Sequence, residues 1–297
     1  MTREEFLKIY RSIVPAHAYR EVNGVGIYTI PAFSAYPGID HGFSARTGGV
    51  SGGCFSSLNL SFTRPEQREN VMENYRIFCD AAGIPLDSMV MDAYEHGTTV
   101  LCVNRFDCRR GYDREPLPSC DGLVTDDPEV TLITGHADCM AFYFYDPVKK
   151  GIGLCHAGWR GALDRIGSEV IKTMQTACGS DPKDIVCGVG PSICPKCFEV
   201  GDDVAENFVI AFPQCDLLGE NARGRATVDL WQVATAQFLE CGILPEHIHL
   251  MGVCTFEDER LYSHRRDKGK TGGMAAFLRL LPEKEMVDKR PGKEYNS

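Results

Sequence analysis

The chain is poor in basic residues. Its 297 residues include 31 Lys and Arg against 41 Asp and Glu, which gives a formal net charge of −10 at pH 7. Nucleic acids and anionic membrane surfaces are bound by a concentrated basic face, and no stretch of this sequence supplies one. We therefore expect neither nucleic acid nor a membrane among the partners of this protein.

Long apolar runs are also missing. A helix that spans a bilayer needs roughly 18 or more apolar residues in succession, and no window approaches that length. The first residues, Met1 to Phe6, contain no apolar segment of the kind found in export signals. We therefore expect a cytoplasmic location, in which most of the 14 cysteines are reduced and buried rather than paired.

The cysteine spacing does not support a four-ligand structural zinc site. Cys194-Pro195-Lys196-Cys197 is a C-x-x-C with Cys187 upstream, but the chain has no second C-x-x-C. Two interpretations stay open for the pair: a redox-active dithiol, or two thiols that are neighbours in a loop by chance. The sequence favours the second.

Helical and strand patterns intermix along the chain without strict alternation. Hydrophobic spacing predicts helices over residues 4–13, 65–83, 162–178, 202–212 and 230–241, and strands over 25–30, 98–103, 122–125, 130–134, 140–145, 151–155, 185–189, 226–228, 248–252 and 274–281. The glycine-dense stretch 41–53 fits neither period, which predicts a loop. Because no linker divides residues 1–297, we predict one α+β domain with mixed sheets. Residues 1–38 are expected to be an extension that covers an edge, and residues 283–297 a frayed polar tail.

Residues 135–161 carry the most informative pattern. Two apolar runs, 140–145 and 151–155, are separated by a turn at 146–150. This arrangement predicts a hairpin or a short crossover between two buried strands. The residues that precede the first strand and those that follow the second then lie at one end of a sheet.

That end of the sheet would gather a thiol and an imidazole. Asp138 and Cys139 precede the first strand, His156 follows the second, and His96 lies in a connection beside a glycine. His96, Cys139 and His156 would give Zn²⁺ three N and S ligands and leave a fourth position open, as in catalytic zinc sites. The Cys–His pair also permits a thiolate nucleophile with an imidazole base. Taken singly, each residue also fits a buried core position.

Two arginines lie beside glycines. Arg46 precedes a Thr-Gly-Gly run, and Arg160 precedes a single glycine. Such a pair can hold a phosphate or carboxylate while the glycines let backbone N–H groups approach it, although two solvated arginines are the alternative. His41 and Asn59 are candidates for further polar contacts.

Short blocks rich in Gly, His, Cys and Arg run through the chain from about residue 39 onward. They are His41-Gly42-Phe43-Ser44-Ala45-Arg46, His96-Gly97, Ala137-Asp138-Cys139, His156-Ala157-Gly158-Trp159-Arg160-Gly161, Gly190-Pro191-Ser192-Ile193, Cys254-Thr255 and Ser263-His264-Arg265-Arg266-Asp267. In content and order these blocks resemble the laccase-domain family, also called the multicopper polyphenol oxidase or YfiH-like family. The resemblance implies a single domain of layered mixed β-sheets flanked by helices.

The resemblance also implies a function. Family members are associated with purine nucleoside phosphorolysis, with adenosine, inosine and methylthioadenosine as substrates, and with adenosine deamination. His96, Cys139 and His156 would form one catalytic metal site, for Zn²⁺ or alternatively Cu²⁺. Purine nucleosides and phosphate would be the partners. Asp138 would carry a proton or orient a ligand.

The chain departs from the family pattern at four places. Tyr94-Glu95 stands where a Gln and an apolar residue usually precede the His-Gly pair, and His136 replaces a common Thr. His264 replaces a Tyr, and Gly273 stands where an Arg often follows. The proposed metal ligands are all present, so these departures bear on substrate contacts.

Two other functions are compatible with the resemblance. Copper-dependent oxidation of phenols needs several coppers and therefore many imidazoles, whereas this chain has eight histidines and a single His-x-His, His247-Ile248-His249. A metal-dependent partner-binding module is the non-enzymatic alternative. The few, ungrouped imidazoles argue against phenol oxidation, and the polar, glycine-lined character of the predicted site favours catalysis over the non-enzymatic module.

Overall fold

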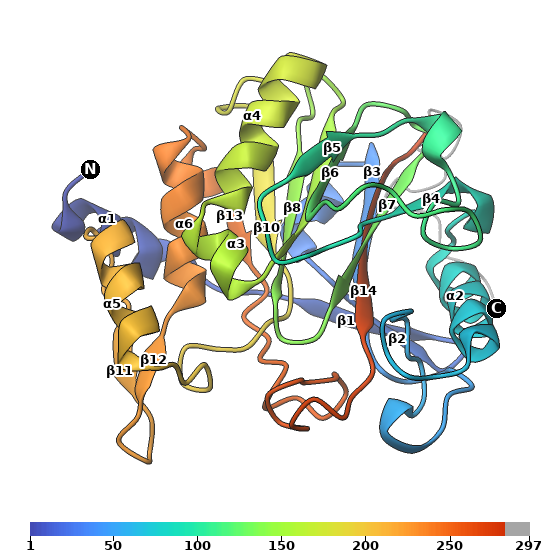
Figure 1. Ribbon diagram of the computed structural model, residues 1–297. Coiled ribbons are helices and arrows are strands. Elements are labelled where there is room, and N and C mark those ends of the chain that lie inside the picture. The colour runs from blue at the N-terminus through green and yellow to red at the C-terminus, as the bar shows by residue number, and fades with distance from the viewer. Residues whose placement is uncertain (283–297) are drawn as a thin grey trace.

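The computed structural model describes residues 1–282, so the predicted polar tail lies outside the described residues (Figure 1). The helices are α1 (Arg3–Ser12), α2 (Arg68–Ala82), α3 (Trp159–Leu163), α4 (Ile166–Cys178), α5 (Asp202–Ala211) and α6 (Leu230–Glu240). The strands are β1 (Ala18–Val22), β2 (Val25–Thr29), β3 (Ile39–Ser44), β4 (Met89–Met91), β5 (Val100–Cys102), β6 (Gly122–Thr125), β7 (Thr131–His136), β8 (Met140–Tyr145), β9 (Ile152–Ala157), β10 (Val186–Val189), β11 (Leu218–Glu220), β12 (Ala226–Val228), β13 (Ile248–Leu250) and β14 (Met274–Leu280). No helix in this part of the chain is both long and apolar enough to cross a membrane.

Two mixed sheets form the centre of the molecule. The first has the order β1-β2-β3-β14-β7-β4, and the second β13-β10-β8-β9-β6-β5. Helix α2 covers the first sheet, while α3, α4 and α6 lie on the side of the second (Figure 1). A small β11-β12 pair stands apart from both sheets. The fold is therefore α+β with layered mixed sheets flanked by helices, which confirms the fold class predicted from the sequence.

The apolar runs of the central strands are continuous because both faces of each sheet are buried. In β8, Met140, Phe142 and Phe144 belong to the core beneath the helices, whereas Ala141 and Tyr143 belong to the core between the sheets. Side chains alternate across a strand, so one six-residue run supplies two cores. The hairpin of β8 and β9 is thereby fixed in the middle of the molecule.

The prediction of a loop over residues 41–53 is wrong at its beginning. Residues 39–44 form β3, which pairs with β2 and with β14. A Cβ atom at Gly42 would lie only 2.6 Å from Cε1 of Phe277, on the neighbouring strand. Glycine is therefore required at this position for close packing inside a sheet rather than for a turn.

The helix predicted over residues 162–178 is divided in two. Arg165 has φ 69°, in the left-handed region, and separates α3 from α4. Its guanidinium pairs with Glu240 and lies 4.4 Å from the ring centroid of Phe212. The spacing of apolar residues favoured a single helix. The chain instead turns at Arg165, where the side chain makes these contacts.

The N-terminal residues are integrated into the fold. Helix α1 begins with a capping box of Thr2 and Glu5, and its Phe6 is fully buried in the core that includes α6. Strand β1 pairs with β2, which in turn pairs with β3 and extends the first sheet. That residues 1–38 are an extension of the domain that covers an edge stays a prediction.

Candidate active site

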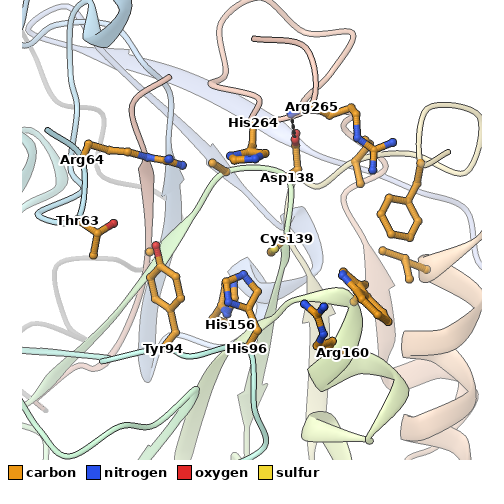
Figure 2. A pocket seen from close by; sticks show the side chains of 16 residues that line it. Thr63, Arg64, Tyr94, His96, Asp138, Cys139, His156, Arg160, His264 and Arg265 are labelled. Carbon is orange, nitrogen blue, oxygen red and sulfur yellow. Dashed lines mark hydrogen bonds between the residues drawn. The ribbon is translucent and has the colours of Figure 1, made fainter. Parts of the chain in front are cut away.

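A cavity of about 480 Å³ opens where β8 begins and β9 ends (Figure 2). Histidine, cysteine and arginine side chains line it together with apolar side chains. The residues that line it are Thr63, Arg64, Tyr94, His96, Gly135, Ala137, Asp138, Cys139, His156, Trp159, Arg160, Ile193, Phe198, Leu230, His264 and Arg265. Segments far apart in sequence therefore meet at the end of the sheet where the sequence predicted a thiol and an imidazole to lie together.

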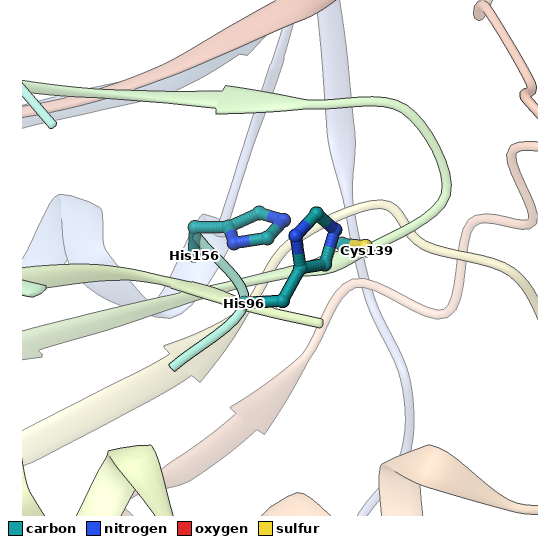
Figure 3. A group of neighbouring side chains, drawn as sticks. All are labelled: His96, Cys139 and His156. Carbon is teal, nitrogen blue, oxygen red and sulfur yellow. The ribbon is translucent and has the colours of Figure 1, made fainter. Parts of the chain in front are cut away.

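His96, Cys139 and His156 lie together in this cavity (Figure 3). Cys139 directly precedes β8, and His156 lies opposite Ala141 in the antiparallel hairpin of β8 and β9. His96 comes from the connection between β4 and β5. Their potential ligand atoms all lie within 4.8 Å of one another. Two imidazoles and one thiolate form a donor set that suits Zn²⁺ or copper.

Asp121 holds this cluster in place. Its carboxylate lies 3.1 Å from Nδ1 of His156 and accepts backbone N–H bonds from Glu95, His96 and Gly97 at 3.2, 2.9 and 2.9 Å. The carboxylate directs Nδ1 of His156 away from the cavity and leaves Nε2 for a ligand, as in carboxylate–histidine–metal arrangements. Asp121 thus fixes both histidines of the cluster.

The pKa of Asp121 reflects the same contacts. Burial acts to raise that pKa, but the hydrogen bonds from His156 and from the backbone of Gly97 and Glu95 lower it below its ordinary value. Asp121 is therefore ionised near neutral pH and places a negative charge beside His156.

Glycines make room for the two imidazoles. A Cβ atom at Gly158 would lie 2.6 Å from Cδ2 of His96 and 3.3 Å from Cε1 of His156. A Cβ atom at Gly161 would lie 2.6 Å from the carbonyl oxygen of Gly97. The Gly-Trp-Arg-Gly block therefore allows the His96 connection to lie directly against the beginning of α3.

The backbone is strained at this site. His96 has φ 65° and Asp138 has φ 84°, both in the left-handed region that non-glycine residues rarely adopt. Surrounding hydrogen bonds hold both residues in these conformations. Strain of this kind is concentrated at functional sites.

Asp138 is a positioning residue in this arrangement. Its carboxylate accepts hydrogen bonds from Oγ1 of Thr255 at 2.6 Å and from the backbone N–H of Arg265 at 2.7 Å. Its own carbonyl oxygen accepts the N–H of Ile193 at 3.0 Å. Asp138 therefore connects three segments beside Cys139, and two of its partners, Ile193 and Arg265, line the cavity.

His136 and Tyr94 support the cluster from behind. Nδ1 of His136 lies 3.2 Å from the carbonyl oxygen of Cys139, and since a carbonyl only accepts, Nδ1 carries the proton. Burial lowers the pKa of His136 and keeps the ring neutral. The ring of Tyr94 lies 4.4 Å from that of His156, centroid to centroid. Both departures from the family pattern thus contact the potential metal ligands or their backbone.

Cys139 and His156 shift each other's charge. Burial acts to raise the pKa of the Cys139 thiol, but the imidazoles of His156 and His96 lower it below its ordinary value. Burial acts to lower the pKa of His156, but the Cys139 thiolate and Asp121 raise it. The metal-free pair therefore favours a thiolate and an imidazolium, and a thiolate is the form that binds metal.

This shift predicts the pH dependence of alkylation in chelator-treated protein. Cys139 should react with iodoacetamide at a lower pH than Cys102. The imidazoles lower the pKa of the Cys139 thiol, whereas partial desolvation raises the pKa of Cys102, a residue that is exposed overall. The measurement is peptide-level labelling over a pH series, in which both cysteines are followed in the same sample. A labelling midpoint for Cys139 at or above that of Cys102 would contradict the thiolate assignment.

Arg64 and Arg160 line the cavity, and the guanidinium of neither forms an ion pair with any of the described residues. Nε of Arg64 is buried without a hydrogen-bond partner among the described residues. Arg160 is exposed at the cavity, and its guanidinium lies 4.3 Å from the ring centroid of Trp159. Figure 2 shows the two arginines on different sides of the cavity. Their donors are available to an anionic ligand.

The structure does not bring Arg46, His41 and Asn59 into the cavity. Arg46 donates from Nε to the carbonyl of Ser56 and lies over the ring of Tyr262. Nε2 of His41 accepts the backbone N–H of Ile30 inside the first sheet. Asn59 is fully buried, and its Oδ1 accepts the backbone N–H groups of Ser61 and Gly273. All three residues thus lie outside the cavity lining, and their assignment to substrate stays a prediction.

Sequence reasoning missed Asp121, Arg64 and Tyr94 as residues of this site. Asp121 directly precedes β6 and belongs to no motif, and Arg64 stands in an irregular segment before α2. Tyr94 was visible only as a departure from the family pattern. These residues reach the site through packing between segments that are distant in sequence. The spacing of residue types along the chain does not predict such packing.

The expectation of a single metal site stays a prediction, because the described residues offer more than one group of potential ligands. Besides the His96 cluster, they contain a second group of potential ligands, Cys194, Cys197 and Cys254. Cys187 does not take part, because its fully buried Sγ faces the carbonyl of His247 at 3.7 Å. The third thiol near the C-x-x-C comes instead from Cys254, far downstream in the sequence.

Comparison with known proteins identifies the family. Residues 40–281 match the family described as multi-copper polyphenol oxidoreductase laccase, and the chain belongs to this family. This match confirms the resemblance predicted from the sequence blocks.

Several relatives in this family carry enzyme names. Purine nucleoside phosphorylase YlmD of Bacillus subtilis is 36% identical over 243 residues, which cover 80% of this chain and 87% of the relative. Human purine nucleoside phosphorylase LACC1 is 32% identical over 86% of this chain, which spans 59% of that protein. The crystal structure of YlmD from Geobacillus stearothermophilus superposes with a TM-score of 0.82 at 32% identity, over 89% of this chain and 98% of that one.

Proposed function

We propose that this protein is a purine nucleoside phosphorylase that acts on adenosine, inosine and methylthioadenosine and also deaminates adenosine. The observation that carries the proposal is the meeting of the His96–Cys139–His156 cluster with the unpaired guanidinium of Arg64 in one cavity. Relatives named purine nucleoside phosphorylase support the same activity. Ligand cavities of about 300–1,000 Å³ accept small molecules of this class.

The reaction exchanges one bond at C1′ of the nucleoside. A phosphate oxygen bonds to C1′, the bond from C1′ to N9 of the purine breaks, and the departing base takes a proton. The products are a pentose 1-phosphate and the free purine. The protein must therefore hold a dianion beside C1′ and stabilise charge on the base.

Arg64 and Arg160 are the residues that would bind phosphate. The chain carries a net charge of −10, so positive potential in the cavity has to come from a few placed groups. An unpaired guanidinium offers two parallel N–H donors that match phosphate oxygens. Arg64 replaces Arg46 in this role because it lines the cavity.

The purine would lie against the apolar part of the cavity. Phe198, Ile193 and Trp159 all line it, and flat rings bind well to such surfaces. Asp138 and His136 hold Cys139 in position beside it.

His96, Cys139 and His156 would hold a metal ion, with Zn²⁺ preferred over Cu²⁺ for their mixed N and S donors. When bound, such an ion supplies Lewis-acid chemistry at an open coordination position, which suits attack of water on C6 of adenine during deamination. In that reaction water replaces the amino group and ammonia leaves.

Phenol oxidation by several coppers is less well supported. Of the two ligand clusters found in the described residues, only one contains histidine. A multicopper centre needs several imidazole-rich groups side by side. We therefore prefer the nucleoside reaction to the one in the family's description.

One assay tests the proposed function. Metal-analysed protein is incubated with adenosine, inosine or methylthioadenosine, with and without phosphate, and the products are separated by chromatography. We expect free purine only when phosphate is present, and inosine from adenosine in its absence. Oxidation of a phenol without any nucleoside turnover would overturn the proposal.

Exchange of the two arginines for lysine should separate the two activities. Lysine keeps the charge but loses the fork of donors, so Arg64→Lys and Arg160→Lys are each expected to weaken phosphorolysis about ten- to a hundredfold, or about 1.5–3 kcal/mol. Deamination, which uses no phosphate, should fall less. The measurement is kcat/KM for phosphate and for adenosine deamination in each variant.

Arg46→Lys is the matched control, because Arg46 lies outside the cavity. Equal losses of both activities in the Arg64 and Arg160 variants, at unchanged metal content, would show that these arginines maintain the cavity instead of binding phosphate.

A further inference from the structure

Three thiols meet outside the active-site cavity. The Sγ atoms of Cys194, Cys197 and Cys254 all lie within 4.8 Å of one another. Cys194 and Cys254 are 6% and 7% exposed, and Cys197 is partly buried. Tetrahedral zinc bonds sulfur at about 2.3 Å, which separates neighbouring sulfurs by roughly 3.8 Å. Small side-chain adjustments would therefore bring all three sulfurs to one ion.

Backbone hydrogen bonds hold the three cysteines in this arrangement. The N–H groups of Cys197 and Phe198 both donate to the carbonyl of Cys194 at 3.0 Å, which closes a tight turn around the C-x-x-C. The N–H of Cys194 donates to Sγ of Cys254 at 3.4 Å. Cys254 is held by a parallel bridge to Ser192. The group is built by two segments that are fixed to each other.

A carboxylate and an access route complete the set. Oε1 of Glu257 lies 3.7 Å from Sγ of Cys197, and the Glu257 side chain is exposed. A cavity of about 470 Å³, separate from the active-site cavity, borders Cys194, Cys254 and Glu257. A disulfide would use two of the three thiols and leave the third without a role. The three thiols already meet, and the exposed Glu257 side chain beside Cys197 can supply a carboxylate as the fourth ligand by rotating toward them.

We propose that Cys194, Cys197 and Cys254, with Glu257 as the fourth ligand, bind a second metal ion of the thiophilic divalent class, Zn²⁺ above all. Its four protein ligands make the site a closed, structural one. The site is independent of the reaction proposed for the His96 cluster, with which it shares no residue.

The position of this site explains what the ion would stabilise. Ile193 and Phe198, on either side of the C-x-x-C, line the active-site cavity. Thr255, next to Cys254, donates its hydroxyl to the Asp138 carboxylate at 2.6 Å. An ion behind these two segments would therefore fix one wall of the cavity and the support of Asp138.

Cobalt substitution in the Cys139→Ala variant gives the sharpest test. This substitution removes the only sulfur ligand of the His96 cluster, so any sulfur-to-cobalt charge-transfer absorption must come from the other thiols. Full-length Cys139→Ala protein, kept reduced, is titrated with Co²⁺ after chelator treatment. We expect intense near-ultraviolet absorption that saturates at about one equivalent and is bleached by Zn²⁺.

Further substitutions assign the absorption to its ligands. Adding Cys254→Ser or Cys197→Ser to Cys139→Ala should abolish it, and Glu257→Gln should weaken Co²⁺ binding while preserving the sulfur bands. Adding Cys102→Ser, an exposed cysteine outside both clusters, should leave the absorption unchanged. Zinc analysis of the unsubstituted protein is expected to give about two ions per chain.

Three outcomes would overturn the proposal. They are the lack of any sulfur-to-cobalt absorption in folded Cys139→Ala protein, its persistence after Cys254→Ser and Cys197→Ser, and a zinc content of one that Cys139→Ala reduces to none. None of these results depends on nucleoside turnover, so this site and the proposed activity fail or stand separately.

Discussion

Cys139→Ala is expected to lower nucleoside phosphorolysis and adenosine deamination at least about a thousandfold, which corresponds to about 4 kcal/mol of transition-state stabilisation. Cys139 supplies the only sulfur of the His96 cluster, and alanine leaves two imidazoles facing the cavity without a thiolate. The two remaining ligands hold an ion much more weakly than three. The measurements are turnover, zinc content and thermal unfolding of the same preparation.

The zinc content of Cys139→Ala should fall by about one ion per chain. The fold should be retained, because the site is open to the cavity and does not link elements of the hydrophobic core. Cys102→Ala, which removes an exposed thiol from the edge strand β5, is the control for loss of a cysteine. Turnover in Cys139→Ala within tenfold of the unsubstituted protein would place the chemistry elsewhere in the molecule.

The hairpin that carries Cys139 and His156 was predictable from the sequence for a physical reason. Residues 140–145 and 151–155 are continuous apolar runs separated by a turn, and burial on both faces of the sheet requires such runs. The turn between them determines which strand ends meet, but β9 continues through Ala157, so His156 lies inside this strand and not after it as predicted.

Strand β3 could not be recognised in the same way. Its residues contain a glycine and polar side chains, which are typical of loops, but Gly42 packs beneath Phe277 and His41 accepts a backbone hydrogen bond from Ile30. These contacts come from β14 and from the segment after β2. Local propensity carries no information about partners so distant in sequence.

The arginines show the same limit at the site. A guanidinium beside glycines is a reasonable phosphate ligand, yet Arg46 faces Ser56 and Tyr262, whereas Arg64 enters the cavity from a segment without a motif. Likewise, Cys254 completes the C-x-x-C group from the far side of the chain. The sequence could predict that arginines and cysteines would act as ligands. Which arginine enters the cavity, and which third cysteine joins the C-x-x-C, depends on the fold.

The carboxylate of Asp121 should prove nearly as important as the metal ligands themselves. It is 1% exposed and accepts four hydrogen bonds, three from the backbone at residues 95–97 and one from Nδ1 of His156. Asparagine has the same shape but replaces one oxygen with an NH₂ group, which cannot accept. Whichever way the amide points, some of these donors lose their acceptor.

Asp121→Asn is therefore expected to weaken zinc binding about ten- to a hundredfold, because the orientation of His156 and His96 depends on this carboxylate. The free energy of unfolding should fall by about 2–4 kcal/mol, since each buried donor left unpaired costs about 1–3 kcal/mol. Zinc affinity is measured by competition with a chelating dye, and stability by urea unfolding of the metal-free protein. Asp126→Asn, an exposed residue on the same segment, controls for the loss of one negative charge.

The pH dependence of this loss distinguishes a charged support from a packing contact. The hydrogen bonds hold the pKa of folded Asp121 below its ordinary value, so its stabilising contribution is present above the unfolded carboxyl pKa of about 3.9 and disappears as the pH falls through the lower folded value. The stability difference between the unsubstituted protein and Asp121→Asn should therefore be full at neutral pH and shrink in acid. A packing defect would persist unchanged at every pH at which the protein stays folded. If the stability difference is constant with pH, or if zinc affinity is unchanged in Asp121→Asn, the carboxylate does not orient the metal ligands and the electrostatic account of this site is wrong.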